Sequence, residues 1–177
     1  LLFLLIKLIG LFTNDYGLAL NLFYLLTFPL ATVCAMAALR QFGLSWGTSV
    51  FAGVLYSLLP YHFVRGQHHL FLAAYFLVPL AVMVILWMAT GRLSLIDNAT
   101  GRLRLNWREP KLIASVAICL MIAAGGTYYA YFTCFFLLVA GCVVALQRRS
   151  ARQLLLPAAL IGVVFSGLML NLLPSIL

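Results

Sequence analysis

The sequence predicts an all-α, polytopic transmembrane helical bundle of about six spans, with a short cytoplasmic β-hairpin loop. Three observations lead to this fold class. Hydrophobic residues make up 66% of the chain and charged residues 8%, and the mean hydropathy is +1.14, whereas a soluble domain is about half apolar and a quarter charged. Apolar runs of close to 20 residues recur along the chain, the length that a helix needs to cross a bilayer. Basic residues stand at the ends of these runs.

Short loops separate most of the six expected spans, and one longer loop lies between the third and the fourth. They run from about Tyr16 to Leu39, Ser45 to Phe63, Leu70 to Met88, Leu112 to Ala124, Tyr128 to Leu146, and Leu154 to Leu173. Residues 1–12 are too few to span, and we expect either a truncated helix or an interfacial one whose Lys7 reaches water. We interpret residues 1–177 as a single transmembrane domain. Because the chain starts at Leu1 inside an apolar run, we also expect it to be an internal fragment of a longer protein.

The basic residues predict the orientation of the spans. With six crossings, nine of them fall on one side: Arg40, Arg92, Arg102, Arg104, Arg108, Lys111, Arg148, Arg149 and Arg152. Cytoplasmic loops carry the Lys and Arg excess, so the loops 90–111 and 148–152 are predicted to be cytoplasmic. The same placement excludes a nucleic-acid-binding protein despite the net charge of +8, since no basic face carries interleaved aromatic residues.

The cytoplasmic loop 90–110 alternates apolar and polar residues on either side of a turn-forming segment. RLSLI and RLRLNW flank DNATG. Alternation around such a turn is typical of a β-hairpin.

The predicted outer face holds an unusual stretch, YHFVRGQHH, at residues 61–69. It contains all three histidines of the chain, His62, His68 and His69, together with Arg65 and Gln67. Generic polarity at a membrane boundary would explain such residues as interfacial anchors. Arginine also suits bidentate phosphate recognition, and histidine can donate to phosphate oxygens. We therefore consider the stretch a candidate substrate-binding site.

Two further outer features are candidates. Asp15 is the single carboxylate predicted on this face, and it could serve as a catalytic base or simply as a helix cap. Tyr128 and Tyr129 follow two glycines in GGTYY, where the backbone could approach a ligand closely, although an aromatic interfacial belt explains them equally well. We expect no cofactor. A divalent metal ion stays an alternative, held by His62, His68, His69 and Asp15, but adjacent histidines diverge on a helix.

Residues 58–80, LLPYHFVRGQHHLFLAAYFLVPL, together with NLFYLLTFPLA and GGTYYAYF, resemble a group of large bacterial membrane proteins described as glycosyltransferases of the GT-C superfamily. The resemblance implies a multi-helix fold in the bacterial inner membrane, membrane lipids as surroundings, and a lipid-linked sugar donor with a polyprenyl phosphate. It also implies an outer active site with an essential acidic residue, to which Asp15 could correspond or which could lie upstream of Leu1.

Two other classes of function stay open at this point. A transporter or flippase usually carries ionisable residues at mid-membrane, and the expected spans hold none there. A structural subunit would need only anchoring loops.

Overall fold

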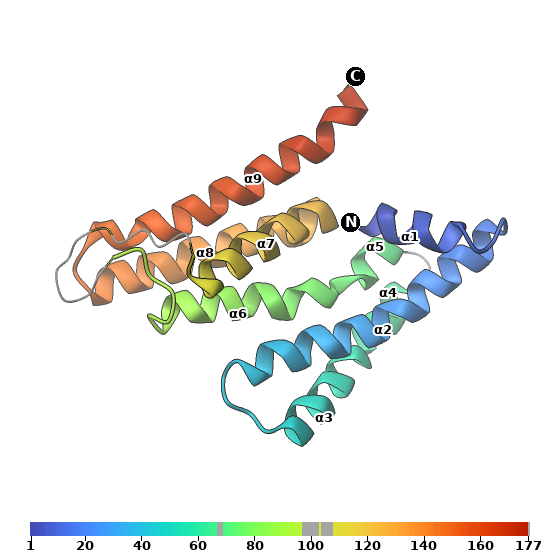
Figure 1. Ribbon diagram of the computed structural model, residues 1–177, viewed down its shortest axis with the longest axis horizontal. Helices are drawn as coiled ribbons and strands as arrows, with labels where there is room; N and C mark the ends of the chain where they lie inside the picture. The colour runs from blue at the N-terminus through green and yellow to red at the C-terminus, as the bar shows by residue number, and fades with distance from the viewer. Residues whose placement is uncertain (67–68, 97–102, 104–107, 177) are drawn as a thin grey trace. The chain divides into compact units, whose positions relative to one another are not determined.

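The computed structural model describes residues 1–66, 69–96, 103 and 108–176, with side chains as far as residue 171 (Figure 1). This part of the chain is helical and contains no strand. It divides into two compact units, Leu1–Leu80 and Ala81–Leu177, called unit 1 and unit 2 below. The expectation of an all-α protein is confirmed, and that of a single transmembrane domain stays a prediction.

Unit 1 is built around one long helix. Its elements are α1 (Leu2–Gly10), α2 (Tyr16–Arg40), α3 (Trp46–Ser57), α4 (Pro60–Arg65), α5 (Leu70–Ala73) and the 3₁₀ turn η1 (Tyr75–Leu77), followed by α6 (Val78–Ala89), whose first residues belong to this unit. Helix α2 contacts α1, α3, α5 and η1. Residues 1–12, expected as a truncated or interfacial helix, form the nine-residue α1, which packs on α2.

Helices α2 and α3 pack through mostly small residues that recur at about every fourth position. The buried positions of α2 are Ala19, Phe23, Thr27, Ala31, Ala35 and Ala38, and those of α3 are Ser49, Gly53 and Ser57. The approach is close, because a Cβ at Gly53 would lie 2.7 Å from the carbonyl oxygen of Thr32. Small side chains that let backbones approach are the usual basis of helix association in membranes, where no water is expelled.

The second expected span, Ser45 to Phe63, is interrupted. Helix α3 has 12 residues and ends at Ser57, so it is only about 18 Å long. A new helix, α4, begins at Pro60. Proline cannot donate to the preceding turn and disfavours a helical conformation at the residue before it, which explains the break at Leu58–Leu59.

Unit 2 contains three long helices after the remainder of α6. They are α7 (Pro110–Gly125), α8 (Thr127–Gln147) and α9 (Leu155–Ile176), with the 3₁₀ turn η2 (Ala151–Leu154) between the last two. All three contact one another. Two glycines sit at the crossings: a Cβ at Gly141 would lie 2.5 Å from Pro157 Cγ, and one at Gly167 would lie 2.7 Å from the Cβ of Ala123.

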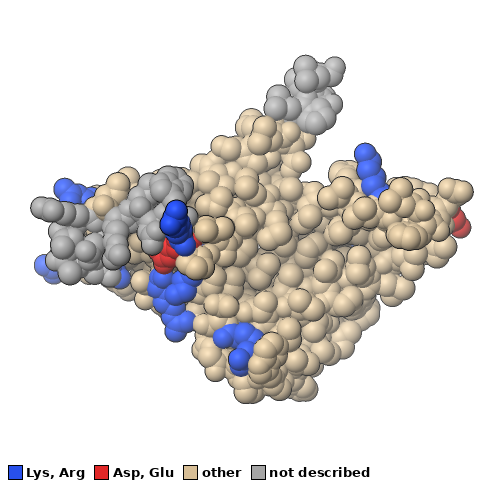
Figure 2. All heavy atoms as spheres, in the orientation of Figure 1, with Lys and Arg blue, Asp and Glu red and all other residues tan. Residues whose placement is uncertain are grey.

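One end of unit 2 is basic. Helices α6 and α8 end there and α7 and α9 begin there, and a Cβ at Gly91 would lie 2.6 Å from the Arg148 guanidinium. Figure 2 shows lysine and arginine gathered at this end of the unit. The described basic residues on these segments are Arg92, Arg108, Lys111, Arg148, Arg149 and Arg152. These described basic residues therefore lie at one end of unit 2, and the cytoplasmic placement of the loops 90–111 and 148–152 stays a prediction.

Four segments of the described chain are long and apolar enough to cross a membrane: Tyr16–Arg40, Leu70–Ala89, Thr127–Gln147 and Ala151–Asn171. A membrane protein is thus plausible. Helix α7, at 16 residues, and the interrupted α3–α4 segment are shorter, so the count of six spans is not confirmed.

The cytoplasmic hairpin is not confirmed either. One antiparallel bridge joins Ile96 to Leu103. The remaining residues of the expected hairpin, 97–102 and 104–107, lie outside the described residues.

Candidate functional site

The stretch 61–69 begins with a short helix, and that helix ends at a glycine. Helix α4 closes at Gly66, whose N–H donates to the carbonyl of His62 at 2.9 Å. A Cβ at Gly66 would lie 2.9 Å from the carbonyl oxygen of Phe63, so the sharp exit requires glycine. Beyond it, the N–H of His69 donates to the carbonyl of Arg65 at 2.8 Å. Arg65 and His69 are therefore joined through the backbone.

His62 is fully buried and surrounded by polar and aromatic side chains. Its Nε2 lies 2.8 Å from Thr27 Oγ1, and its Nδ1 lies 3.3 Å from the hydroxyl of Tyr75. Its ring stacks on Phe28 with 3.9 Å between ring centroids. The hydroxyl of Tyr24 donates to the His62 carbonyl at 3.3 Å. Because neither face of the ring is open to solvent, the imidazole contacts only neighbouring segments of the protein and holds them together.

Arg65 is half-buried on α4, and its guanidinium carbon lies 5.6 Å from the centroid of the Tyr61 ring. This cation–π contact holds the side chain over an aromatic face without neutralising its charge. A guanidinium so placed still has N–H groups to offer to a phosphate.

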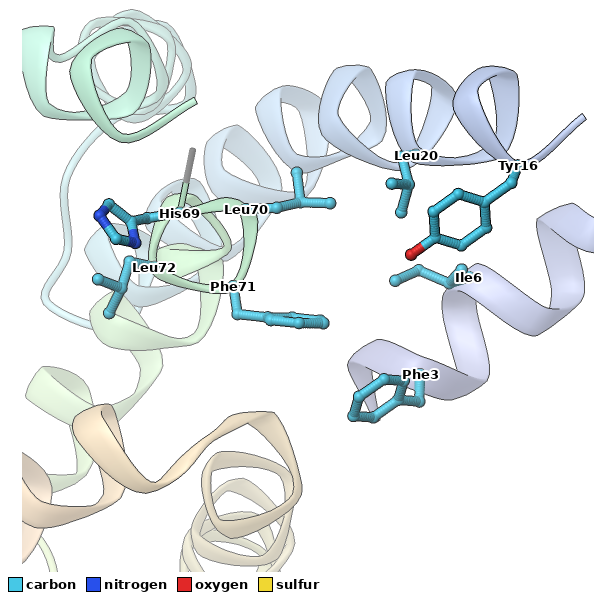
Figure 3. A pocket seen from close by; sticks show the side chains of 8 residues that line it. All are labelled: Phe3, Ile6, Tyr16, Leu20, His69, Leu70, Phe71 and Leu72. Carbon is cyan, nitrogen blue, oxygen red and sulfur yellow. The ribbon is translucent and has the colours of Figure 1, made fainter. Parts of the chain in front are cut away.

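His69 is exposed and lines an apolar pocket of about 420 Å³ (Figure 3). The pocket lies between α1, the start of α2, and α5. Its other lining residues are Phe3, Ile6, Tyr16, Leu20, Leu70, Phe71 and Leu72. Figure 3 shows Tyr16 and His69 at opposite sides of it. The centroids of the Phe3 and Phe71 rings, from α1 and α5, are 5.2 Å apart. The structure thus brings residues near the N-terminus together with the end of the stretch 61–69.

Asp15 lies immediately before Tyr16 and caps α2. Its Oδ1 accepts from the N–H of Leu18 at 3.2 Å, and its own N–H donates to Thr13 Oγ1 at 3.1 Å. The cap explains why α2 starts where it does. Since Asp15 is exposed and adjacent in sequence to a pocket residue, its catalytic role stays a prediction.

Tyr128 and Tyr129 lie in unit 2, in the first turn of α8. Their ring centroids are 5.8 Å apart, and Tyr128 is 55% exposed. The preceding Gly126 has a φ of 138°, which a residue with a side chain rarely adopts. Nearby, the side-chain amide of Asn171 donates to the carbonyl of Ala123 at 3.0 Å, which ties α9 to the end of α7.

Gln67 and His68 lie outside the described residues. Within the part of the chain that is described, no three His, Cys, Asp or Glu side chains gather as a metal site would require. The zinc alternative depends on His68, so it stays untested.

Several residues of this region were not predicted from the sequence. Thr27, Tyr24 and Tyr75 lie within apolar spans, and Tyr56 lies within the expected second span. The available signal was their polarity: a hydroxyl in an apolar run must find a partner when it is buried. The identity of that partner depends on contacts across helices, which spacing along the chain does not give.

No protein-family model, curated protein or solved structure matches this chain.

Proposed function

We propose that the chain is part of a membrane glycosyltransferase that takes a sugar from a polyprenyl-phosphate donor on the outer face of the bacterial inner membrane. The observation that carries the proposal is the pocket of unit 1. It is lined by apolar side chains with room for a hydrocarbon chain, and His69 and Tyr16 provide polar groups beside it. Arg65 lies four residues before His69, joined to it by a backbone hydrogen bond.

The proposed roles follow from chemistry. In sugar transfer the acceptor hydroxyl attacks the anomeric carbon, the bond from that carbon to the phosphate oxygen breaks, and the polyprenyl phosphate leaves. Arg65 and His69, with Gln67 and His68 from the same stretch, would stabilise the charge on the leaving phosphate. Asp15 would accept the proton of the acceptor. Tyr128 and Tyr129 are proposed as sugar-stacking residues of the same enzyme.

The proposed topology has six crossings. The four candidate spans are completed by α7 and by the segment from α3 to α4, which would cross as a broken helix. Broken helices are tolerated at membrane depth where protein covers them. The basic end of unit 2, the short hairpin of loop 90–110 and Arg40 would then face the cytoplasm, as the positive-inside rule requires.

The test measures sugar transfer from radiolabelled polyprenyl-phosphate donors by the full-length protein in lipid nanodiscs. Arg65→Ala and His69→Ala are expected to lower kcat/KM about tenfold or more, the effect of removing one charge-assisted hydrogen bond. Arg40→Ala serves as the matched control. Arg40 lies in the last turn of α2, packs over the Trp46 ring with 4.6 Å to its centroid, and takes no part in the pocket. Unaltered transfer by both site variants would contradict the proposal.

A second variant tests the pocket without changing any polar group. Leu20→Trp fills part of the space between α1 and α5. We expect a higher KM for long-chain donors and a nearly unchanged KM for a short-chain donor, since only the long chain needs the pocket. An equal rise for both would show that the pocket does not hold the lipid. Movement of the lipid across the bilayer without sugar transfer would identify a flippase instead.

A further inference from the structure

The imidazole of His62 lies between two hydroxyl groups whose protons can be assigned. Thr27 Oγ1 is 2.6 Å from the carbonyl oxygen of Tyr24. A carbonyl oxygen only accepts, so the threonine proton points to it. The oxygen that faces His62 Nε2 at 2.8 Å therefore presents a lone pair, and Nε2 must carry the proton.

The second ring nitrogen then has no proton in a neutral imidazole. It faces the Tyr75 hydroxyl at 3.3 Å. The same hydroxyl lies 2.9 Å from the carbonyl oxygen of Tyr56 and 3.4 Å from that of Ser57. The shortest of these distances is the one to the Tyr56 carbonyl, and the hydroxyl proton can also turn to Nδ1, which accepts when the ring is neutral with Nε2 protonated. Both ring nitrogens therefore have a partner in a neutral His62 with Nε2 protonated.

These contacts connect three separate elements of unit 1. Thr27 and Phe28 belong to α2, Tyr56 and Ser57 end α3, and Tyr75 lies in η1. His62 itself lies in α4, the helix that leads to Arg65, and its carbonyl accepts from the N–H of Gly66 and from the Tyr24 hydroxyl. These contacts of His62 therefore fix the direction in which the chain continues toward Arg65 and His69.

We propose that His62 is a positioning residue: a neutral imidazole, protonated on Nε2, that locks the segment carrying Arg65 and His69 against α2 and the end of α3. It does not touch the donor. The inference rests on the proposed function only in taking Arg65 and His69 as the residues that bind the donor. The tautomer and the lock are properties of unit 1 that can be measured without any sugar transfer.

The surroundings predict that acid opens the lock. The titratable groups that face His62 are phenols: Tyr24 from α2, Tyr75 from η1 and, through Tyr75, Tyr56 from α3. On its own helix Arg65 lies over Tyr61. Among the described residues of unit 1 the carboxylate is Asp15, engaged as the cap of α2.

Among the described residues of unit 1, no counter-charge therefore faces the ring to favour an imidazolium. A second proton would place an unpaired charge in a buried site beside Thr27 and Tyr75, so protonation of His62 is expected to weaken the contacts that hold the segment.

The first experiment is ¹⁵N NMR of the full chain labelled at histidine, in nanodiscs at pH 7.5. The sequence has three histidines, and His62→Gln assigns the signals of His62 by their loss. We expect one neutral ring with Nε2 protonated. An imidazolium, or a ring protonated on Nδ1, at pH 7.5 would overturn the proposal.

The second experiment tests positioning. Thr27→Val and Tyr75→Phe each remove one hydrogen bond to His62 without substituting Arg65 or His69. We expect KM for the donor to rise about three- to tenfold with kcat nearly unchanged, and hydrogen exchange at the His69 amide to speed up. Thr133→Val, a buried threonine of unit 2, is the control and should change neither. Unaltered hydrogen exchange at the His69 amide in both variants would overturn the positioning role of His62. Faster exchange in the variants, together with no sugar transfer by the unsubstituted protein, would support that role and refute the glycosyltransferase.

Discussion

The two units bury their polar side chains in different ways. In unit 1, Thr27, His62 and Tyr75 bond to one another across α2, α4 and η1. In unit 2, the buried hydroxyls of Ser115 and Thr133 donate to the carbonyls of Lys111 and Tyr129, each four residues earlier in the same helix, at 2.7 and 2.8 Å. A hydroxyl bonded to its own helix is satisfied wherever that helix lies.

The difference identifies which unit is held in a fixed geometry by polar contacts. A bond across elements is made only in one arrangement, and losing it leaves a buried group unpaired. In unit 2 a polar bond across helices, from Asn171 to the Ala123 carbonyl, accompanies close crossings at Gly141 and Gly167. The buried hydroxyls of Ser115 and Thr133, in contrast, bond only within their own helices. Unit 1 is therefore the unit in which we propose the precisely positioned site. Three sets of substitutions break or sharpen this comparison.

The largest effect is expected where a methyl group would meet backbone. Gly53→Ala puts a Cβ 2.7 Å from the carbonyl oxygen of Thr32, so α2 and α3 must separate. We expect a loss of about 1–3 kcal/mol in the free energy of unfolding, typical of overpacking. Gly47→Ala, in the same helix with nothing within 4 Å, should be neutral or slightly stabilising. Unfolding in detergent micelles measures both, and equal losses would contradict the close packing.

An intermediate effect separates the two kinds of buried threonine. Thr27 and Thr133 both donate to a carbonyl of their own helix, but only Thr27 also accepts from a histidine. Thr27→Val should cost about 1–2 kcal/mol, since it leaves the His62 N–H buried without an acceptor. Thr133→Val should cost less than about 0.5 kcal/mol, because it removes only a bond within one helix. Equal costs in the same unfolding assay would remove the distinction drawn between the units.

The smallest effect is a gain. Ser49 Oγ is buried in α3 and is one of two buried side-chain atoms without a hydrogen-bond partner in the described part of the chain; the other is Trp87 Nε1. Ser49→Ala should stabilise the protein by about 1 kcal/mol, because an unsatisfied hydroxyl costs roughly that much. Ser57→Ala is the control, since Ser57 Oγ donates to the Val54 carbonyl at 2.8 Å. A destabilised Ser49→Ala would reveal a partner for that hydroxyl.

Composition and the recurring apolar runs predicted the helical class. Of the six expected spans, four correspond to segments long and apolar enough to cross a membrane. The prediction of one continuous helix for the second span was wrong. Pro60 stands near the end of that span, but the prediction gave more weight to the length of the apolar run than to one proline. Helix α7 ends at Gly125, one residue after the expected end at Ala124.

For the site, the sequence located the stretch 61–69 but did not divide it. In the structure Gly66 ends the helix before His69, and His62 is buried while His69 is exposed. What separates them is the contact of His62 with Thr27, 35 residues away in the chain. No local pattern encodes such a contact.

The small-residue packing of α2 against α3 also determines how freely each helix can vary. At Ala31, Ala35 and Gly53 a larger side chain would push the backbones apart, so selection can draw on few amino acids there. At the exposed positions of the same helices, such as Leu25, Val33 and Phe51, any apolar residue meets the demands of lipid. Accepted substitutions along α2 and α3 should therefore be scarce at every fourth position and plentiful between them.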